Sequence, residues 1–127
     1  MSGWIGVDLD CTLAEYHGWK GDDEPPGKPI PNMVERVKRW LSKGKTVKIF
    51  TARVDGDVDG KQEKMIKKWC KEHIGQELEV TNVKTRHMYE LWDDRAITVR
   101  RNTGRVLPQH MRPRDNYTSW KNIEDEK

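Results

Sequence analysis

Apolar and polar positions along the chain divide into short apolar runs and longer segments of helical spacing. Residues 4–7 are apolar throughout, which is typical of a strand buried on both faces of a sheet. Apolar residues then recur every three or four positions from Met33 to Leu41, until Gly44 stops the pattern, and predict an amphipathic helix. Residues 46–50 are rich in β-branched and aromatic side chains and predict a second strand.

The second half of the chain continues this alternation without an internal repeat. Its predicted elements are a helix over residues 65–74 that ends at Gly75, strands over 78–82 and 90–92, and a hairpin in which 97–99 pairs with 105–107 across the turn 102–104. Strands that alternate with helices in this way imply a parallel sheet with right-handed crossovers.

Turn-forming residues dominate the segment between the first strand and the first helix. Glycine, proline and aspartate are frequent from Gly18 to Pro31, and we expect a loop or short flap over about residues 14–31. Asn32 with Glu35, and Asp59 with Gln62, have the spacing of capping boxes and predict the starts of the two helices.

Composition limits the class of protein. A chain of 127 residues with 35% charged residues and a formal net charge of +3 predicts one globular domain with a very polar surface. No apolar run approaches the length of a membrane span, and the first residues lack the pattern of a signal peptide, so we expect a cytoplasmic protein without a membrane partner. Cys11 and Cys70 are far apart in the sequence and are expected to be reduced thiols.

The strongest candidate chemistry follows the first strand directly. Side chains alternate along an extended backbone, so Asp8 and Asp10 are expected to point the same way at the carboxyl end of this strand, where open α/β sheets bind ligands. Two carboxylates held close either bind a divalent metal or raise one pKa enough to make a proton donor. The alternative is a surface turn whose acids cap the next element.

Polar residues also follow the other predicted strands. Thr51 follows the second strand, Lys84 the third, and Asp93 with Asp94 the fourth. Because parallel strands end at one edge of a sheet, these side chains would supply a hydroxyl, a cation and further carboxylates to a phosphoryl-transfer site. Each has an alternative: Thr51 as a cap, Lys84 in a surface ion pair, and the two aspartates as a strand terminus.

With these motifs the chain resembles the haloacid dehalogenase superfamily of phosphohydrolases, in particular its small hydrolase-like members from bacteria and phages. The resemblance covers about residues 4–107 and rests on 8–12, 49–53, 81–84 and 93–94 in that order. It implies a Rossmann-like three-layer α/β sandwich with a mainly parallel sheet and a C-terminal hairpin. No cap domain fits between the motifs. We therefore expect one phosphatase domain over 1–107 and a tail over 108–127, extended or mobile. Cys11 departs from the glycine that the superfamily most often has there.

The resemblance also implies roles for these residues. Asp8 would attack phosphorus and form an aspartyl-phosphate, and Asp10 would protonate the leaving oxygen and then activate water. Thr51 and Lys84 would hold the phosphoryl oxygens. A Mg²⁺ cofactor would be bound by Asp8, the backbone carbonyl of Asp10, and Asp93, with Asp94 as a ligand or just behind the ligands.

Residues near the motifs are candidates for substrate binding. They are Thr12, Tyr16, Trp19, Ala52 and Arg53. Tyr16 and Trp19 could stack on a base or cover an edge of the core, and Arg53 could reach a substrate anion or pair with a surface acid. His73 lies on an apolar stripe and is expected to be structural.

We therefore expect a Mg²⁺-dependent phosphomonoester hydrolase. By analogy, its substrate would be a phosphorylated nucleotide or small molecule, or a nucleic-acid end. The alternative is a module on the same fold that binds or sequesters a phosphorylated ligand without turnover. For the tail, which carries Arg112, Arg114, Tyr117 and Trp120, a nucleic-acid contact is the less favoured alternative to an extended or mobile segment.

Overall fold

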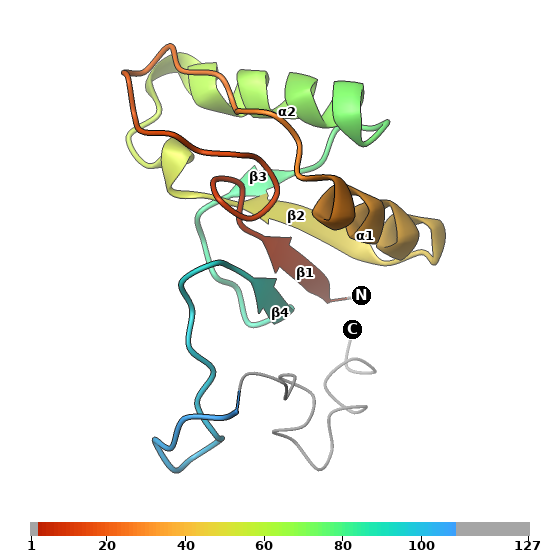
Figure 1. The fold of residues 1–127 in the computed structure, drawn as a ribbon, viewed down its shortest axis with the longest axis vertical. Coiled ribbons are helices and arrows are strands. Elements are labelled where there is room, and N and C mark those ends of the chain that lie inside the picture. The colour runs from red at the N-terminus through yellow and green to blue at the C-terminus, as the bar shows by residue number, and fades with distance from the viewer. Residues whose placement is uncertain (1–2, 109–127) are drawn as a thin grey trace.

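A four-stranded parallel sheet forms the centre of the molecule (Figure 1). The computed structural model describes residues 3–108. The strands are β1 (Trp4–Val7), β2 (Thr46–Phe50), β3 (Val80–Thr81) and β4 (Met88–Trp92), in the spatial order β3-β2-β1-β4. All neighbouring strands run parallel, which confirms the predicted α/β, Rossmann-like fold. None of the helices within 3–108 has the length and apolarity needed to cross a membrane.

Two helices connect the first three strands. Helix α1 (Pro31–Ser42) joins β1 to β2, and α2 (Lys61–His73) joins β2 to β3. Both crossovers step in the same direction across the sheet, so right-handed connections place both helices on one face. Their apolar sides share one buried cluster with β1 and β2, which includes Val37 and Ile66. Residues 3–108 thus supply two layers, and the third layer of the expected sandwich is not among them.

The later strands differ in extent from their prediction. Strand β3 covers two residues instead of 78–82, because this edge strand pairs only with the end of β2, at Ile49 and Phe50. Strand β4 begins earlier than predicted, at Met88, which pairs with Trp4 across an irregularity in the register. The predicted hairpin is present as a turn with a single bridge between Val99 and Val106.

Neither predicted capping box forms. Helix α1 begins with Pro31 at its first position, where the missing N–H costs nothing, and Asn32 lies inside the first turn. At α2, Asp57 does the capping: its carboxylate accepts from the backbone N–H of Gln62 at 2.8 Å and of Glu63 at 3.0 Å. Asp59 instead adopts a left-handed backbone conformation just before the helix.

The flap (residues 14–31) leaves and returns through a narrow antiparallel base. The backbone N–H of Glu15 donates to the Lys28 carbonyl at 2.8 Å, and that of Ile30 donates to the Leu13 carbonyl at 2.9 Å. A Cβ at Gly27 would lie 2.1 Å from the Glu15 carbonyl oxygen, so only glycine fits there. Trp69 of α2 donates to the Gly27 carbonyl at 2.8 Å and ties the flap to the helix.

Candidate active site

The carboxyl ends of β1 and β4 lie at the same level of the sheet. Val7 is in register with Trp92, and the backbone N–H of Asp8 donates to the Trp92 carbonyl at 2.9 Å. Asp8 therefore leaves β1 where Asp93 leaves β4. On the other side, the Thr51 N–H donates to the Thr81 carbonyl at 3.0 Å, which aligns the ends of β2 and β3.

Three carboxylates meet at this edge. Asp8, Asp93 and Asp94 each offer an oxygen, and these oxygens lie within 4.8 Å of one another. Asp93 also accepts from the backbone N–H of Arg95 at 2.8 Å, and the Thr12 hydroxyl lies 3.5 Å from Asp94 Oδ1. Carboxylate oxygens are the ligands that Mg²⁺ prefers, so this group could hold that ion.

The surroundings of Asp8 oppose its ionisation. Burial, which is the largest cause, a hydrogen bond with Asp94, and the charges of Asp93, Asp94 and Asp10 together raise the pKa of the Asp8 carboxyl from 3.8 to about 7. Near neutral pH this carboxyl therefore holds a proton for much of the time. A divalent cation among the three carboxylates would offset their repulsion and favour the anion that a nucleophile requires.

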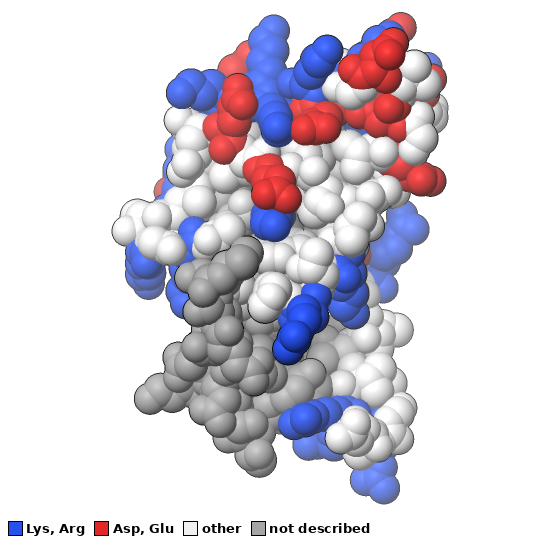
Figure 2. Space-filling view, turned by 180° about the vertical axis from the view of Figure 1, so that it is seen from behind, with Lys and Arg blue, Asp and Glu red and all other residues white. Residues whose placement is uncertain are grey.

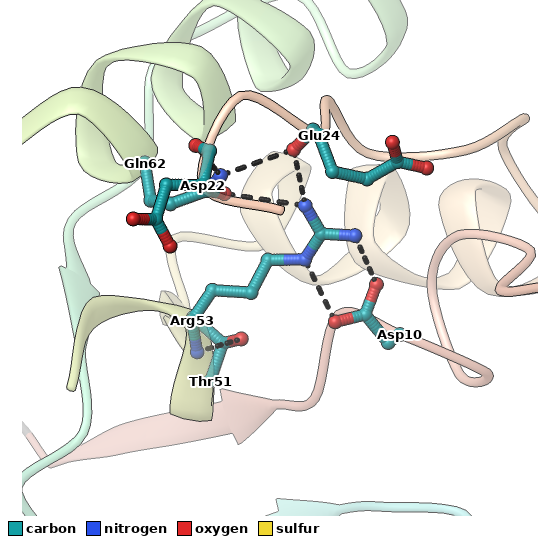
Figure 3. Close-up of polar contacts among 6 residues, drawn as sticks. All are labelled: Asp10, Asp22, Glu24, Thr51, Arg53 and Gln62. Carbon is teal, nitrogen blue, oxygen red and sulfur yellow. Dashed lines mark hydrogen bonds and ion pairs between the residues drawn. The ribbon is translucent and has the colours of Figure 1, made fainter. Parts of the chain in front are cut away.

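Asp10 lines the same cavity as Asp8 and Asp93 and is held by Arg53 (Figure 3). Arg53 Nε donates to Asp10 Oδ2, and Nη2 donates to Oδ1, each at 2.8 Å. The Arg53 side chain is only 4% exposed and that of Asp10 is 22% exposed. This is a two-point, largely buried ion pair between the ends of β1 and β2. Arg53 thus pairs with an acid of the site itself and not with the surface acid considered in the sequence analysis.

Arg53 also joins the flap to α2. Its Nη1 donates to the Glu24 carbonyl at 2.7 Å and to Gln62 Oε1 at 3.2 Å, and Gln62 in turn donates to the Asp22 carbonyl at 2.7 Å (Figure 3). The guanidinium carbon lies 5.0 Å from the centre of the Trp19 ring. Asp10, the flap and α2 are thus held together by one side chain.

Thr51 is buried at the end of β2. Its hydroxyl oxygen accepts from the Arg53 backbone N–H at 3.2 Å and caps the 3₁₀ turn η1 (Ala52–Val54). The cap is one of the alternatives that the sequence left open. Thr51 also lines the cavity described next, so it is placed to present its hydroxyl to a ligand there.

A cavity of about 810 Å³ opens beside these groups. Its wall includes Asp8, Asp10, Thr51, Ala52, Arg53 and Asp93 from the strand ends, and Tyr16 and Trp19 from the flap. Tyr16 is 37% exposed and Trp19 is 46% exposed, so both rings are accessible to a ligand. Its volume lies within the range of sites that bind small organic molecules.

Three predicted residues lie outside the lining of this cavity. Asp94 contributes to the carboxylate group next to it but does not line the cavity itself. Lys84 is exposed on the loop after β3, and Thr12 reaches only Asp94. The cations in the lining are instead Arg53, Lys61 and Arg95. Arg95 follows the last aspartate motif directly, and this adjacency was a sequence signal for it. No sequence motif indicated that Gln62 and Asp57 belong to the site, because the packing of α2 brings them there.

Cys11 lies at the rim with a left-handed backbone, at φ 72°. Glycine adopts this conformation at little cost, whereas a residue with a Cβ is strained there. Both cysteines are free thiols, and burial raises the pKa of Cys70 to about 12. The backbone at position 11 therefore adopts a conformation in which glycine would be less strained than cysteine.

Comparison with known proteins gives a fold and no function. No known protein family matches the sequence, and no curated protein matches it. Among solved structures, the chain is similar to a conserved protein from Bacteroides thetaiotaomicron, with 21% sequence identity and a TM-score of 0.52. The similarity covers 100% of this chain and 93% of the other. At this identity it supports the α/β fold alone.

Proposed function

We propose that this protein is a Mg²⁺-dependent phosphomonoester hydrolase of the haloacid dehalogenase type. The observation that carries the proposal is the meeting of Asp8, Asp93 and Asp94, with oxygens within 4.8 Å of one another, at the mouth of a cavity that Thr51 and Asp10 also line. A nucleophilic carboxylate, a cation site and a proton carrier side by side are what phosphoryl transfer through an aspartyl-phosphate requires.

In the proposed reaction an Asp8 oxygen attacks phosphorus while the ester P–O bond breaks. The leaving oxygen takes a proton from the Asp10 carboxyl. Asp10 then removes a proton from water, which attacks the aspartyl-phosphate, releases phosphate and restores Asp8. A Mg²⁺ ion held by Asp8, Asp93 and Asp94, with the Asp10 backbone carbonyl as the further ligand implied by the resemblance, would neutralise charge on the phosphoryl group.

The ion pair with Arg53 restricts how Asp10 can act as an acid. As an acid, Asp10 must carry a proton on one of two oxygens that both accept from Arg53. The proton therefore has to replace one of these hydrogen bonds, and we propose that Arg53 shifts toward its Glu24 and Gln62 partners during the first step. Arg53 acts in this scheme as a positioning residue.

Lys84 has no role in this proposal as the structure stands. Arg95, which lines the cavity next to Asp93, replaces it as the exposed cation that could meet the phosphoryl group. We place the enzyme in the cytoplasm, in keeping with two free cysteines in the described chain.

Turnover of an aryl phosphate with and without Mg²⁺ tests the proposal against a non-catalytic binding module. We expect release of phosphate only with Mg²⁺, and a labelled acid-stable phosphoenzyme after rapid quenching with radiolabelled substrate. Asp8→Asn should give neither product. Binding of phosphomonoesters by the wild-type protein without any turnover, at saturating Mg²⁺, would favour the binding module.

A further inference from the structure

The cavity beside Asp8 carries more carboxylates than cations. Apart from the metal-site aspartates and the Asp10–Arg53 pair, its charged lining residues are Asp22, Asp55, Asp57, Asp59, Lys61 and Arg95. This set contains four carboxylates and two cations. The part of the cavity that would receive the non-phosphate end of a substrate is therefore formally negative.

Two of these charges are already compensated. Lys61 donates to Asp23, a carboxylate outside the cavity lining, so its positive charge is offset from elsewhere. Asp57 accepts from two backbone N–H groups at the start of α2, which stabilise its charge. The remaining set is Asp22, Asp55 and Asp59 against Arg95. These three carboxylates are exposed. The charge of Asp22 also interacts with Lys61, whose hydrogen bond goes to Asp23.

The net charge of the whole chain does not predict that this part of the cavity lining is acidic. We call the part formed by Asp22, Asp55 and Asp59 the acidic wall. The formal net charge of the whole chain is +3. On the face shown in Figure 2, red acidic atoms gather with lysines and arginines in the upper part, whereas the coloured atoms of the lower part are blue. The local field of the cavity lining, and not the net charge of the chain, decides which charged ligand enters the cavity.

The aromatic residues define the other property of this wall. Tyr16 and Trp19 present accessible rings to the same space, and one region of the Trp19 ring is occupied by the Arg53 guanidinium at 5.0 Å. Aromatic rings bind flat uncharged groups and cations, both of which an acidic wall also accepts. A group with its own negative charge gains from neither feature.

We infer that the site selects phosphomonoesters whose leaving group carries a single aromatic unit and is uncharged or cationic, and rejects those that carry further negative charge. The inference rests on the proposed phosphatase activity and narrows its substrate class. Nucleoside monophosphates fit this description, because the base and sugar are uncharged. Phosphorylated nucleic-acid ends and nucleoside polyphosphates do not, because each brings additional phosphate charge toward Asp22, Asp55 and Asp59.

Three phenyl esters that differ only in the para substituent test the charge selection: tyramine O-phosphate, phenyl phosphate and 4-carboxyphenyl phosphate. At saturating Mg²⁺ and low salt we expect kcat/KM to fall in that order. The cationic and anionic esters should differ by about tenfold, the effect of a few solvent-screened charges at short range. Added salt should reduce this difference. A 5′-nucleoside monophosphate should likewise be preferred over a 5′-phosphorylated dinucleotide.

A triple variant, Asp22→Asn with Asp55→Asn and Asp59→Asn, assigns the effect to the wall. Amides keep the shape, and asparagine tolerates the left-handed backbone at position 59. The ratio of kcat/KM values between the esters should fall toward equality in this variant. Because intrinsic ester reactivity is the same for both proteins, comparison with wild type removes it. Glu35→Gln on the exposed side of α1 is the matched control and should leave the ratio unchanged.

The outcomes separate this inference from the proposed function. Hydrolysis of all three esters at equal kcat/KM, a preference for the anionic ester, or a preference that survives in the triple variant would overturn the charge selection and leave the phosphatase standing. Absence of hydrolysis of every ester at saturating Mg²⁺ would overturn the phosphatase itself, and the substrate class with it.

Discussion

Both carboxylate oxygens of Asp10 accept from Arg53, two residues beyond Thr51, at 2.8 Å each. The same guanidinium reaches the Glu24 carbonyl of the flap and the Gln62 side chain of α2. One side chain therefore sets the direction of the proposed proton carrier and the position of the flap, and changes at Arg53 should affect both.

Arg53→Lys should lower kcat about tenfold or more while leaving the Mg²⁺ requirement unchanged. A lysine keeps the charge but cannot donate to both Asp10 oxygens and to the flap at once. Because the ion pair is largely buried, we also expect a loss of about 2–3 kcal/mol in the free energy of unfolding, measured in urea. Arg39→Lys on the exposed side of α1 is the control. A wild-type kcat in Arg53→Lys would remove the positioning role.

Asp8→Asn should abolish turnover and change how stability depends on pH. The Asp8 pKa is 3.8 in the unfolded chain and about 7 in the metal-free fold, so between these values the folded protein binds more protons. The stability of metal-free wild type should therefore fall as pH rises from about 4 to 7. Since Asp8 is only half buried, we expect Asp8→Asn to gain about 1–2 kcal/mol at pH 8 and little at pH 4.

Urea unfolding of metal-free wild type and Asp8→Asn at both pH values measures this difference, with Asp55→Asn as the control for loss of an exposed carboxylate. Equal stability of the two proteins at pH 8 would contradict the raised Asp8 pKa. Retained phosphatase activity in Asp8→Asn would remove it as the nucleophile.

Chelation should silence turnover, and added Mg²⁺ should restore it. Asp93→Ala should raise the Mg²⁺ concentration for half-maximal activity at least about tenfold, because a weakly bound hard cation depends on each carboxylate ligand. Calorimetric titration of Mg²⁺ into the substrate-free protein checks the same change without turnover. Asp94→Ala separates a direct ligand from a supporting residue, since the latter should cost less affinity. Full activity in a chelator would refute the metal requirement.

Trp19→Ala should weaken selection for base-containing substrates. Loss of a stacking surface costs roughly 1–3 kcal/mol per base, so kcat/KM for a nucleoside monophosphate should fall relative to a sugar phosphate. Trp19→Phe keeps a ring over Arg53 and should retain much of the preference. Equal losses for the two substrates would show that Trp19 acts on Arg53 and the flap instead of on a base.

Cys11→Gly should stabilise the protein or leave it unchanged. The left-handed backbone at φ 72° strains a residue with a Cβ, and glycine removes that strain at the cost of a more flexible unfolded chain. We expect a gain of up to about 1 kcal/mol in urea unfolding. Cys11→Ala keeps the Cβ and should show no such gain, so equal stability of the two variants would locate the effect outside the backbone.

The regular elements and the meeting of Asp8, Asp93 and Asp94 were predictable because their signals are local. Apolar spacing identified α1 and α2 and the runs that become β1 and β2. Parallel strands end at one edge, and this general rule was enough to bring Asp93 and Asp94 to Asp8. The weakest predictions concerned short-range polar chemistry, as at the two helix starts, where Pro31 and Asp57 replaced the expected caps.

The sequence by itself determined which residues follow each strand, and hence that several carboxylates would share one end of the sheet. Only the tertiary structure decided how those residues pair. Arg53 meets Asp10 from 43 positions away, and Gln62 and Trp19 complete its surroundings from α2 and the flap. Lys84, which the motif order favoured, stays exposed, because β3 ends at Thr81 and the loop beyond it does not turn toward the cavity lining. The periodicity of a chain records which face of an element is buried, whereas ion pairs between loops depend on packing geometry that no local pattern encodes.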